Sequence, residues 1–182
     1  SFQKNEPLLM TFEKNVETGL TAKEIVNEWA EENLATIIKG YGEEKFAYRI
    51  AKMIVEARKK KSIETTTDLV EIIMKATPFY YHYGRIHPAT RTFQAIRIAV
   101  NDELGAITNG LKEAWRLLAP KGRIAVISFH SLEDRIVKHY FNELKTTENA
   151  TVITKKPIVA SEEEMNVNPR ARSAKLRIIE KN

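Results

Sequence analysis

Cysteine is absent from the 182-residue sequence, so the chain can form neither a disulfide bond nor a cysteine-ligated metal site. This absence is typical of proteins in the reducing cytoplasm, where we expect the chain to act. No run of about 18 apolar residues occurs, which excludes a membrane-spanning helix and gives no reason to expect a membrane partner. The sequence does not open with a secretory signal pattern. The four histidines do not stand at metal-ligand spacing with carboxylates, so we predict no metal ion.

Glycine is scarce, and none of the seven glycines forms a glycine-rich turn between a strand pattern and a helix pattern. The sequence therefore shows no cradle for a dinucleotide or a phosphate group. His130 stands beside Ser131, but no nucleophile elbow surrounds the pair. Hydrolysis by a catalytic triad is therefore not expected.

The composition suits a globular protein with a modest basic bias. Hydrophobic residues make up 43% of the chain, which is enough for a sizeable core. The net charge is +5 and the isoelectric point is about 9.3. Such a balance is compatible with a nucleic-acid partner, although many ordinary proteins share it.

The stretch from Arg123 to Arg135 changes character abruptly. Residues 124–127 are apolar and partly β-branched, which predicts a strand buried on both faces, as in a parallel sheet. A cluster of polar residues follows, and after it a helical pattern runs to Leu144. The cluster consists of His130, Ser131, Glu133, Asp134 and Arg135.

Two interpretations of this polar cluster remain open, and both can hold together. Ligands bind outside the carboxyl ends of strands in open α/β sheets, which favours a functional site. The same residues also suit a capped turn, with Ser131 as N-cap and two carboxylates placed favourably for the helix dipole.

Residues 19–86 predict a compact all-helical unit after a structured connector at residues 1–18. The expected helices cover residues 22–30, 32–39, 43–60 and 68–76. Thr21 and Glu24 form the pattern of a capping box. Gly40 to Gly42 is expected to end the second helix in a left-handed conformation. The basic residues 58–61 suit either a solvated helix end or a surface that faces RNA.

Residues 79–85 form an aromatic and basic loop, which suits either the packing of a domain junction or stacking on unpaired bases. Residues 87–182 predict an α/β half. Its long helix covers residues 88–118, and strands are expected near residues 123–129, 151–154 and 175–180. Residues 161–164 predict an acidic loop, and residues 168–173 a turn that carries arginines.

Four blocks of the sequence resemble one protein family, in the family's order and over essentially the whole chain. They are Tyr41–Ala47, His87–Ala95, Ser128–Lys138 and Asn168–Ser173. The family is the bacterial ribosomal RNA small subunit methyltransferase H family, also called MraW. The turn at residues 118–123 is also similar to the one that leads into the fifth strand of class I methyltransferases.

The resemblance implies an enzyme that uses S-adenosylmethionine to methylate the exocyclic N4 of a cytidine in the decoding region of 16S rRNA. The implied partner is the small ribosomal subunit. The implied fold is α/β: the C-terminal half of a Rossmann-like class I methyltransferase with an all-helical domain, residues 19–86, inserted on the substrate side. No residue here matches the family's cofactor-binding half, so we assign no cofactor-binding residue.

The implied reaction suggests roles for the polar motifs. The amino group of cytosine is a weak nucleophile, so the enzyme must align it and accept its hydrogens as charge develops. We expect His130, Ser131, Glu133 and Asp134 to supply these acceptors. We expect RNA contacts from Arg85, His87, Arg91, Arg135, Lys138, Asn168, Arg170 and Arg172. Four of these, His87, Arg91, Arg170 and Arg172, are expected on the same side of the molecule as His130. The alternative for Arg170 and Arg172 is that they are simply solvated turn residues.

Two alternatives to this enzyme are a non-catalytic RNA-binding module, or degenerate relative, and a structural domain that binds a protein partner. About three strands are readable, and they would leave the strand at Ile124 with an unpaired edge. We expect that edge to be covered by the family's cofactor-binding half, which no residue here matches, by a second copy in a homodimer, or by aggregation. Because that half is not matched, we expect the chain alone neither to bind S-adenosylmethionine nor to methylate.

Overall fold

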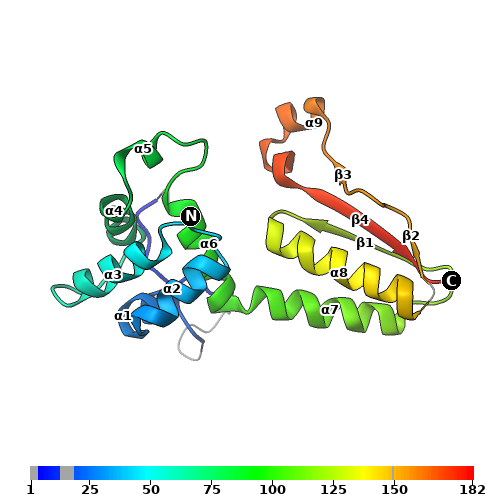
Figure 1. Ribbon diagram of the computed structural model, residues 1–182, viewed down its shortest axis with the longest axis horizontal. Coiled ribbons are helices and arrows are strands. Elements are labelled where there is room, and N and C mark those ends of the chain that lie inside the picture. The colour runs from blue at the N-terminus through cyan, green and yellow to red at the C-terminus, as the bar shows by residue number, and fades with distance from the viewer. Residues whose placement is uncertain (1–3, 13–18, 149) are drawn as a thin grey trace. The chain divides into compact units, whose positions relative to one another are not determined.

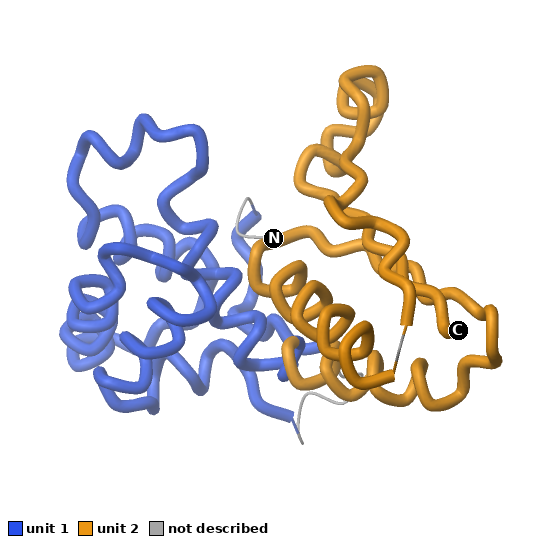
Figure 2. Tube along the Cα trace, turned by 45° about the vertical axis from the view of Figure 1, so that its right-hand side comes forward, with its two compact units in different colours: residues 1–103 blue, residues 104–182 orange. Residues whose placement is uncertain are grey.

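The computed structural model describes residues 4–12, 19–148 and 150–182, and it contains both helices and a sheet. The chain divides into two compact units, residues 1–103 and residues 104–182 (Figure 2). Each unit has its own hydrophobic core. None of the described helices is long and apolar enough to cross a lipid bilayer.

Residues 21–76 of unit 1 contain helices and no strand, as the sequence predicts, apart from an isolated β-bridge at Thr65. The helices of unit 1 are α1 (Ala22–Glu28), α2 (Glu31–Gly40), α3 (Ala47–Arg58), α4 (Thr66–Ala76), α5 (Phe79–His82) and α6 (Ala89–Asn101). The capping box of α1 is confirmed, because the Thr21 hydroxyl accepts from the Glu24 backbone and Glu24 accepts from the Thr21 backbone. A second box, which was not predicted, joins Thr65 and Asp68 at α4.

The boundary between the units lies after Glu103, whereas the sequence placed it after residue 86. The reason is the apolar face of α6, which packs into the core of unit 1. Ala89 and Ile96 are fully buried there, and Phe93 is 5% exposed. The connector is held to the same unit, since Leu8 is fully buried and Pro7 forms a β-bridge with Thr65. Residues 1–3 and 13–18 of the connector lie outside the described residues.

Helix α2 ends differently from the prediction. Gly40 is helical, and no described glycine has a positive φ; the left-handed residue is Glu43, with a φ of 50°. Gly42 instead allows two backbone segments to approach each other closely. A Cβ atom at this position would lie 2.5 Å from the carbonyl oxygen of Ile38 and 2.7 Å from that of Arg91. Glycine therefore lets the end of α2 meet the start of α6.

The long helix expected over residues 88–118 is two helices, α6 and α7 (Glu103–Leu117). The break falls at Asp102, whose φ of 45° is left-handed. Aspartate is one of the few residues other than glycine that tolerates this conformation, so an apolar stripe of helical spacing can continue through a break in the backbone.

Unit 2 is a four-stranded sheet with helices α7 and α8 (Ser131–Thr147) on one face (Figure 1). The strands are β1 (Arg123–Ser128), β2 (Thr151–Val152), β3 (Ile158–Val159) and β4 (Lys175–Glu180). Strand β4 pairs antiparallel with the other three, in the order β1-β4-β2 with β3 also on β4. Strands β1, β2 and β4 confirm the predicted ones, and β3 was not predicted.

The acidic loop predicted at residues 161–164 is wrong. Glu162–Val167 form helix α9, because the hydroxyl of Ser161 accepts from the backbone N–H of Glu164 and caps the helix. Its three glutamates stand in the first turn, where the helix dipole favours negative charge. The arginine-bearing turn is a 3₁₀ helix, η1 (Pro169–Ser173).

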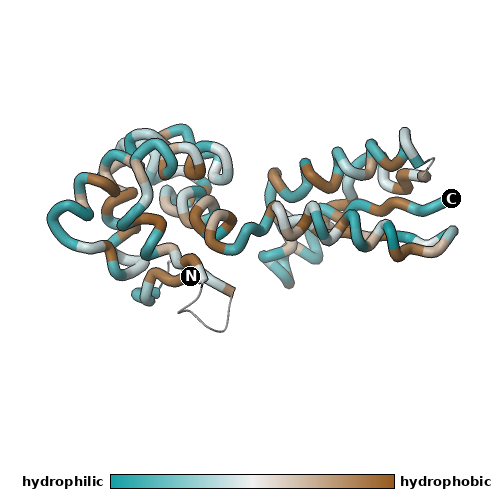
Figure 3. The backbone as a smooth tube through the Cα atoms, turned by 90° about the horizontal axis from the view of Figure 1, so that it is seen from below, coloured by the Kyte–Doolittle hydropathy of each residue, from teal (hydrophilic) through white to brown (hydrophobic). Residues whose placement is uncertain are grey.

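Strand β1 is not buried on both faces. Ile124 and Val126 pack toward α8, whereas Ala125 is exposed and Ile127 is 59% exposed on the opposite face. Successive side chains of a strand point to opposite faces, and in the described residues of unit 2 helices α7 and α8 cover one of them. The helices also carry alternating hydrophobic and hydrophilic segments, as Figure 3 shows. In the described part of the chain β1 pairs only with β4, and that pairing is antiparallel rather than parallel.

Candidate functional site

The turn after β1 is built as a helix cap. His130, not Ser131, is the N-cap residue of α8, with an extended backbone at φ −141° and ψ 168°. Its Nδ1 accepts from the backbone N–H of Glu133 over 3.4 Å. One carboxylate oxygen of Glu133 accepts from the backbone of Phe129 at 2.7 Å and of His130 at 3.2 Å. These bonds fix the turn, and Ser131, the first residue of the helix, is exposed.

His130 and Glu133 also meet through their second polar atoms. Nε2 of His130 lies 3.3 Å from Oε1 of Glu133, and the two side chains are 13% and 19% exposed. The capped-turn interpretation is therefore confirmed, and it holds two of the four predicted catalytic side chains in one rigid arrangement at the carboxyl end of β1.

Asp134 points away from this turn and forms a buried ion pair. Its two oxygens accept from Nε and Nη2 of Arg177 on β4 at 2.7 and 3.2 Å, and Lys175 lies 3.4 Å away. The Arg177 guanidinium holds the pKa of the Asp134 carboxyl below its ordinary value, against the opposing effect of burial. Both oxygens are thus occupied, and the pair joins α8 to the sheet.

The register of the sheet brings the arginine-bearing turn, η1, to the end of the sheet at which His130 follows β1. Ser128, the last residue of β1, faces Lys175, the first residue of β4. Helix η1 ends two residues before Lys175, so Arg170 and Arg172 precede β4 where β1 ends. Both arginines and Asn168 are exposed. The register thus places Arg170 and Arg172 near the end of the sheet where His130 lies, and that they share an RNA-binding side with His130 stays a prediction.

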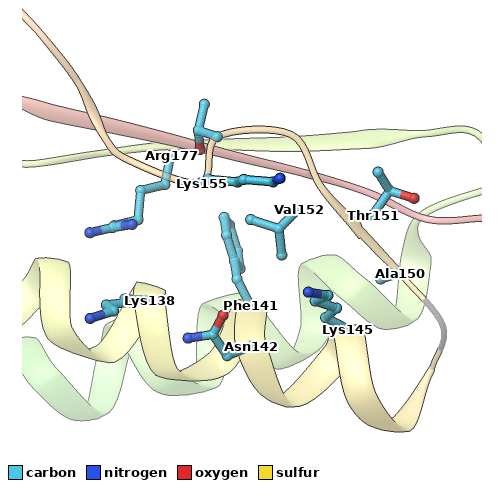
Figure 4. A pocket seen from close by; sticks show the side chains of 10 residues that line it. Lys138, Phe141, Asn142, Lys145, Ala150, Thr151, Val152, Lys155 and Arg177 are labelled. Carbon is cyan, nitrogen blue, oxygen red and sulfur yellow. The ribbon is translucent and has the colours of Figure 1, made fainter.

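The exposed residues Arg135 and Lys138 follow on α8, and Lys138 lines a pocket of about 450 Å³. Lys145 of α8 and Lys155 bring further positive charge to this pocket, and Arg177, which is paired with Asp134, also lines it (Figure 4). Phe141 and Val152 form its apolar part, and Asn142 and Thr151 add polar groups. A cationic pocket with this lining suits an anionic group.

Three predicted RNA contacts belong to unit 1. Arg85 and His87 are exposed, and Nδ1 of His87 accepts from the backbone of Ala89 at the start of α6. Arg91 donates to the carbonyl oxygen of Glu43 over 2.8 Å, which joins two of the sequence blocks, Tyr41–Ala47 and His87–Ala95. That these residues face His130 stays a prediction.

Sequence reasoning missed Arg177, Lys145 and Lys155. Arg177 lies 43 positions from its partner Asp134 in the sequence. A charged residue flanked by apolar neighbours, Leu176 and Ile178, in a terminal strand is the signal that could have marked it as a buried partner. The two lysines carry no distinguishing pattern.

The family model described as the MraW methylase family matches residues 1–182. The chain belongs to the MraW methylase family. This confirms the family that the four sequence blocks resemble, and those blocks hold the cap of α8, the Arg91 contact and the η1 turn described above.

Several curated relatives of this MraW-family chain are named ribosomal RNA small subunit methyltransferase H. The proteins from Synechocystis sp. and Sulfurihydrogenibium sp. are each 55% identical, over 181 and 178 residues, and the one from Persephonella marina is 53% identical over 178 residues. These alignments cover 100%, 98% and 98% of this chain. The chain spans 57–60% of the length of these relatives.

Proposed function

We propose that this chain is the substrate-side part of a methyltransferase that modifies the exocyclic N4 of a cytidine in the decoding region of 16S rRNA, with S-adenosylmethionine as methyl donor. The match to the MraW family over the whole chain carries the proposal. Relatives with about 55% identity that are named rRNA small subunit methyltransferases support it.

The proposed fold is a Rossmann-like sheet, of which unit 2 supplies one end. Strand β1 leads directly into α8, as in a strand-to-helix unit, and its outer edge is unpaired in the described part of the chain. Large parallel sheets often carry an antiparallel strand near one edge, which suits β4, and β2 pairs antiparallel with β4 and so runs parallel to β1. Unit 1 would be the helical domain on the substrate side.

The described residues do not fit a complete site for S-adenosylmethionine. The strand-to-helix turn at β1 is closed by its own cap, because Glu133 occupies the backbone N–H groups of Phe129 and His130. The sequence offers no glycine-rich turn in its place. We therefore assign the donor's site to the part of the relatives that this chain does not match.

The chain's own residues would position the target base. The lone pair of the cytosine amino group is delocalised into the ring, so N4 must be aligned and its hydrogens accepted. The base must also leave its stack to reach such a site. Ser131 is exposed just after the carboxyl end of β1, and we assign the acceptor role to its hydroxyl. His130, Glu133 and Asp134 are positioning residues, since their polar atoms hold the turn and the helix.

The RNA backbone would lie along the cationic residues of unit 2. Arg170 and Arg172 lie near the end of the sheet at which His130 follows β1. The pocket beside α8 is lined by Lys138, Lys145 and Lys155. Phosphate groups bind Lys and Arg clusters with a strong dependence on salt.

Two titrations of the chain test this assignment. A 16S rRNA fragment that contains the decoding region should bind, and its affinity should fall steeply as salt rises. Calorimetric titration with S-adenosylmethionine should show no saturable binding at micromolar concentrations. Saturable binding of the cofactor by the chain alone would place the donor site within these residues, and salt-independent or absent RNA binding would remove the substrate role.

A further inference from the structure

Three aromatic rings on and directly after α5 lie in solvent. Phe79, Tyr80 and Tyr83 are 72%, 68% and 74% exposed, and we call them the α5 rings. Helix α5 and the loop after it project from the helices of unit 1 (Figure 1). Burial of a large aromatic ring is strongly favourable, so three exposed rings within five residues mark a surface that binds something.

The backbone beneath these rings is fixed by the residues between them. The hydroxyl of Tyr81 donates to the buried carboxylate of Glu44 over 2.7 Å, and its ring meets Phe46 edge-on at 5.0 Å. Burial, together with the Glu44 carboxylate, raises the pKa of Tyr81 to about 12, so the phenol keeps its proton and remains a donor. His82 Nε2 lies 3.0 Å from the hydroxyl of Thr77.

This anchoring means that the α5 rings are presented in a defined arrangement. Phe79 and Tyr83 contact each other edge-on with their centroids 5.0 Å apart. A partner that binds preformed rings avoids much of the cost of ordering them.

The charges around the rings select the kind of partner. Between Glu71 and Asp102 the sequence contains no acidic residue, and its Lys and Arg residues are Lys75, Arg85, Arg91 and Arg97. Nζ of Lys45 lies 5.6 Å from the centroid of the Tyr80 ring. Glu44 is 1% exposed and bonded to Tyr81, so it presents little negative charge to a ligand.

We propose that the α5 rings stack on unpaired bases of the RNA substrate, while Lys45 and Arg85 lie near its phosphates. Exposed rings beside cations form the combination by which proteins hold single-stranded nucleic acid, since every base has a flat face. This inference rests on the proposed rRNA substrate and adds a contact surface on unit 1 that is separate from the turn at His130.

Fluorescence anisotropy of the full chain with a labelled single-stranded 16S rRNA fragment tests the proposal. Combined substitution of Phe79→Ala, Tyr80→Ala and Tyr83→Ala should weaken binding by about tenfold or more. The slope of log affinity against log salt should not change, because no charge is removed. Tyr80→Phe should bind like the unmodified chain, since the ring is kept.

Tyr48→Ala is the matched control. Tyr48 is 65% exposed, and Nζ of Lys39 lies 5.3 Å from its ring centroid, but it stands on α3 rather than α5. Its substitution should change the affinity by less than about twofold, because no base stack is assigned to it. On an oligonucleotide with abasic sites the triple variant and the unmodified chain should bind alike. Circular dichroism confirms that each variant is folded.

Equal RNA affinity of the triple variant and the unmodified chain would overturn the stacking proposal and leave the proposed function intact. The same holds if sedimentation shows that the rings join two copies of the chain and the triple variant is monomeric with unchanged RNA affinity. If the unmodified chain binds no RNA, the proposed function and the stacking proposal fall together.

Discussion

Asp134 shows how a residue in a polar motif can serve the fold rather than the reaction. Its side chain and that of Arg177 are 12% and 9% exposed. Removing one partner of a buried ion pair leaves the other charge uncompensated, at a cost of about 3–5 kcal/mol. We therefore expect Asp134→Asn to lower the free energy of unfolding of unit 2 at neutral pH. The replacement of both partners, Asp134→Leu with Arg177→Met, should cost less than either single change.

The same pair predicts a pH dependence. Arg177 lowers the folded-state pKa of Asp134 below its ordinary value of 3.8, so the carboxylate stabilises the fold above that pH. This contribution is lost as the pH falls below about 4, through the folded-state pKa. Unfolding by urea, followed by Trp115 in a Trp29→Phe background, should show this loss in the unmodified chain. A slope equally steep in Asp134→Asn would contradict the assignment.

Gly42 and Gly40 form a matched pair for testing the close approach in unit 1. Gly42→Ala places a Cβ against two carbonyl oxygens, so we expect a loss of about 1–3 kcal/mol. Gly40→Ala meets nothing within 4 Å on a helical residue and should stabilise by about 0.4–1 kcal/mol. Urea unfolding followed by Trp29 in a Trp115→Phe background measures both. Equal effects of the two changes would show that the contact at Gly42 is unimportant.

For single residues, the position of the polar cluster was predictable from the sequence and the partners of its members were not. His130, Ser131 and Glu133 are neighbours in the chain, so their proximity at the end of β1 was predictable. That Asp134 turns toward Arg177 was not, because the two stand 43 positions apart and only the pairing of β1 with β4 brings them together. The capping role of His130 was also missed, since histidine is not among the preferred N-cap residues.

Helix α8 combines the cap with the cationic pocket. Lys138→Gln with Lys145→Gln removes two positive charges from the pocket lining. If both contact phosphates, the slope of log affinity against log salt for single-stranded RNA should become shallower by about 1.4. Lys112→Gln with Lys121→Gln removes the same charge from unit 2 away from the pocket lining and should change the slope much less. Equal slopes for the two double variants would show a general charge effect only.

Element by element, helices with a clear apolar face were predictable and breaks set by single residues were not. The apolar stripes of α1 to α4 predicted the positions of these helices, with ends shifted by a few residues. The stripe of α6 continues into α7, so Asp102 ends a helix without interrupting the pattern. Strand β3 has two residues and α9 has six, which is too short for either periodicity to show.

For the whole molecule, the uncovered face of the sheet is the feature that links structure to proposed function. Ile127 is 59% exposed and Ile153 is 43% exposed. If further strands and helices complete the sheet, Ile127 becomes buried. We expect Ile127→Thr to change the stability of the isolated chain by less than about 0.5 kcal/mol, as at ordinary surface positions. In a fusion with the unmatched part of the Synechocystis relative it should cost more than about 1 kcal/mol. Equally small losses of stability in both proteins would show that this face of the sheet is also exposed in the fusion.

Methylation by that fusion is the most direct test of the proposed function. The chain would be joined to the part of the Synechocystis relative that it does not match, and incubated with S-adenosylmethionine and a 16S rRNA fragment containing the decoding region. Mass spectrometry of the digested RNA would then locate the methyl group. We predict methylation at N4 of one cytidine, with loss of turnover in a variant that combines His130→Ala and Ser131→Ala. Methylation at another atom, or full turnover in that variant, would contradict this prediction.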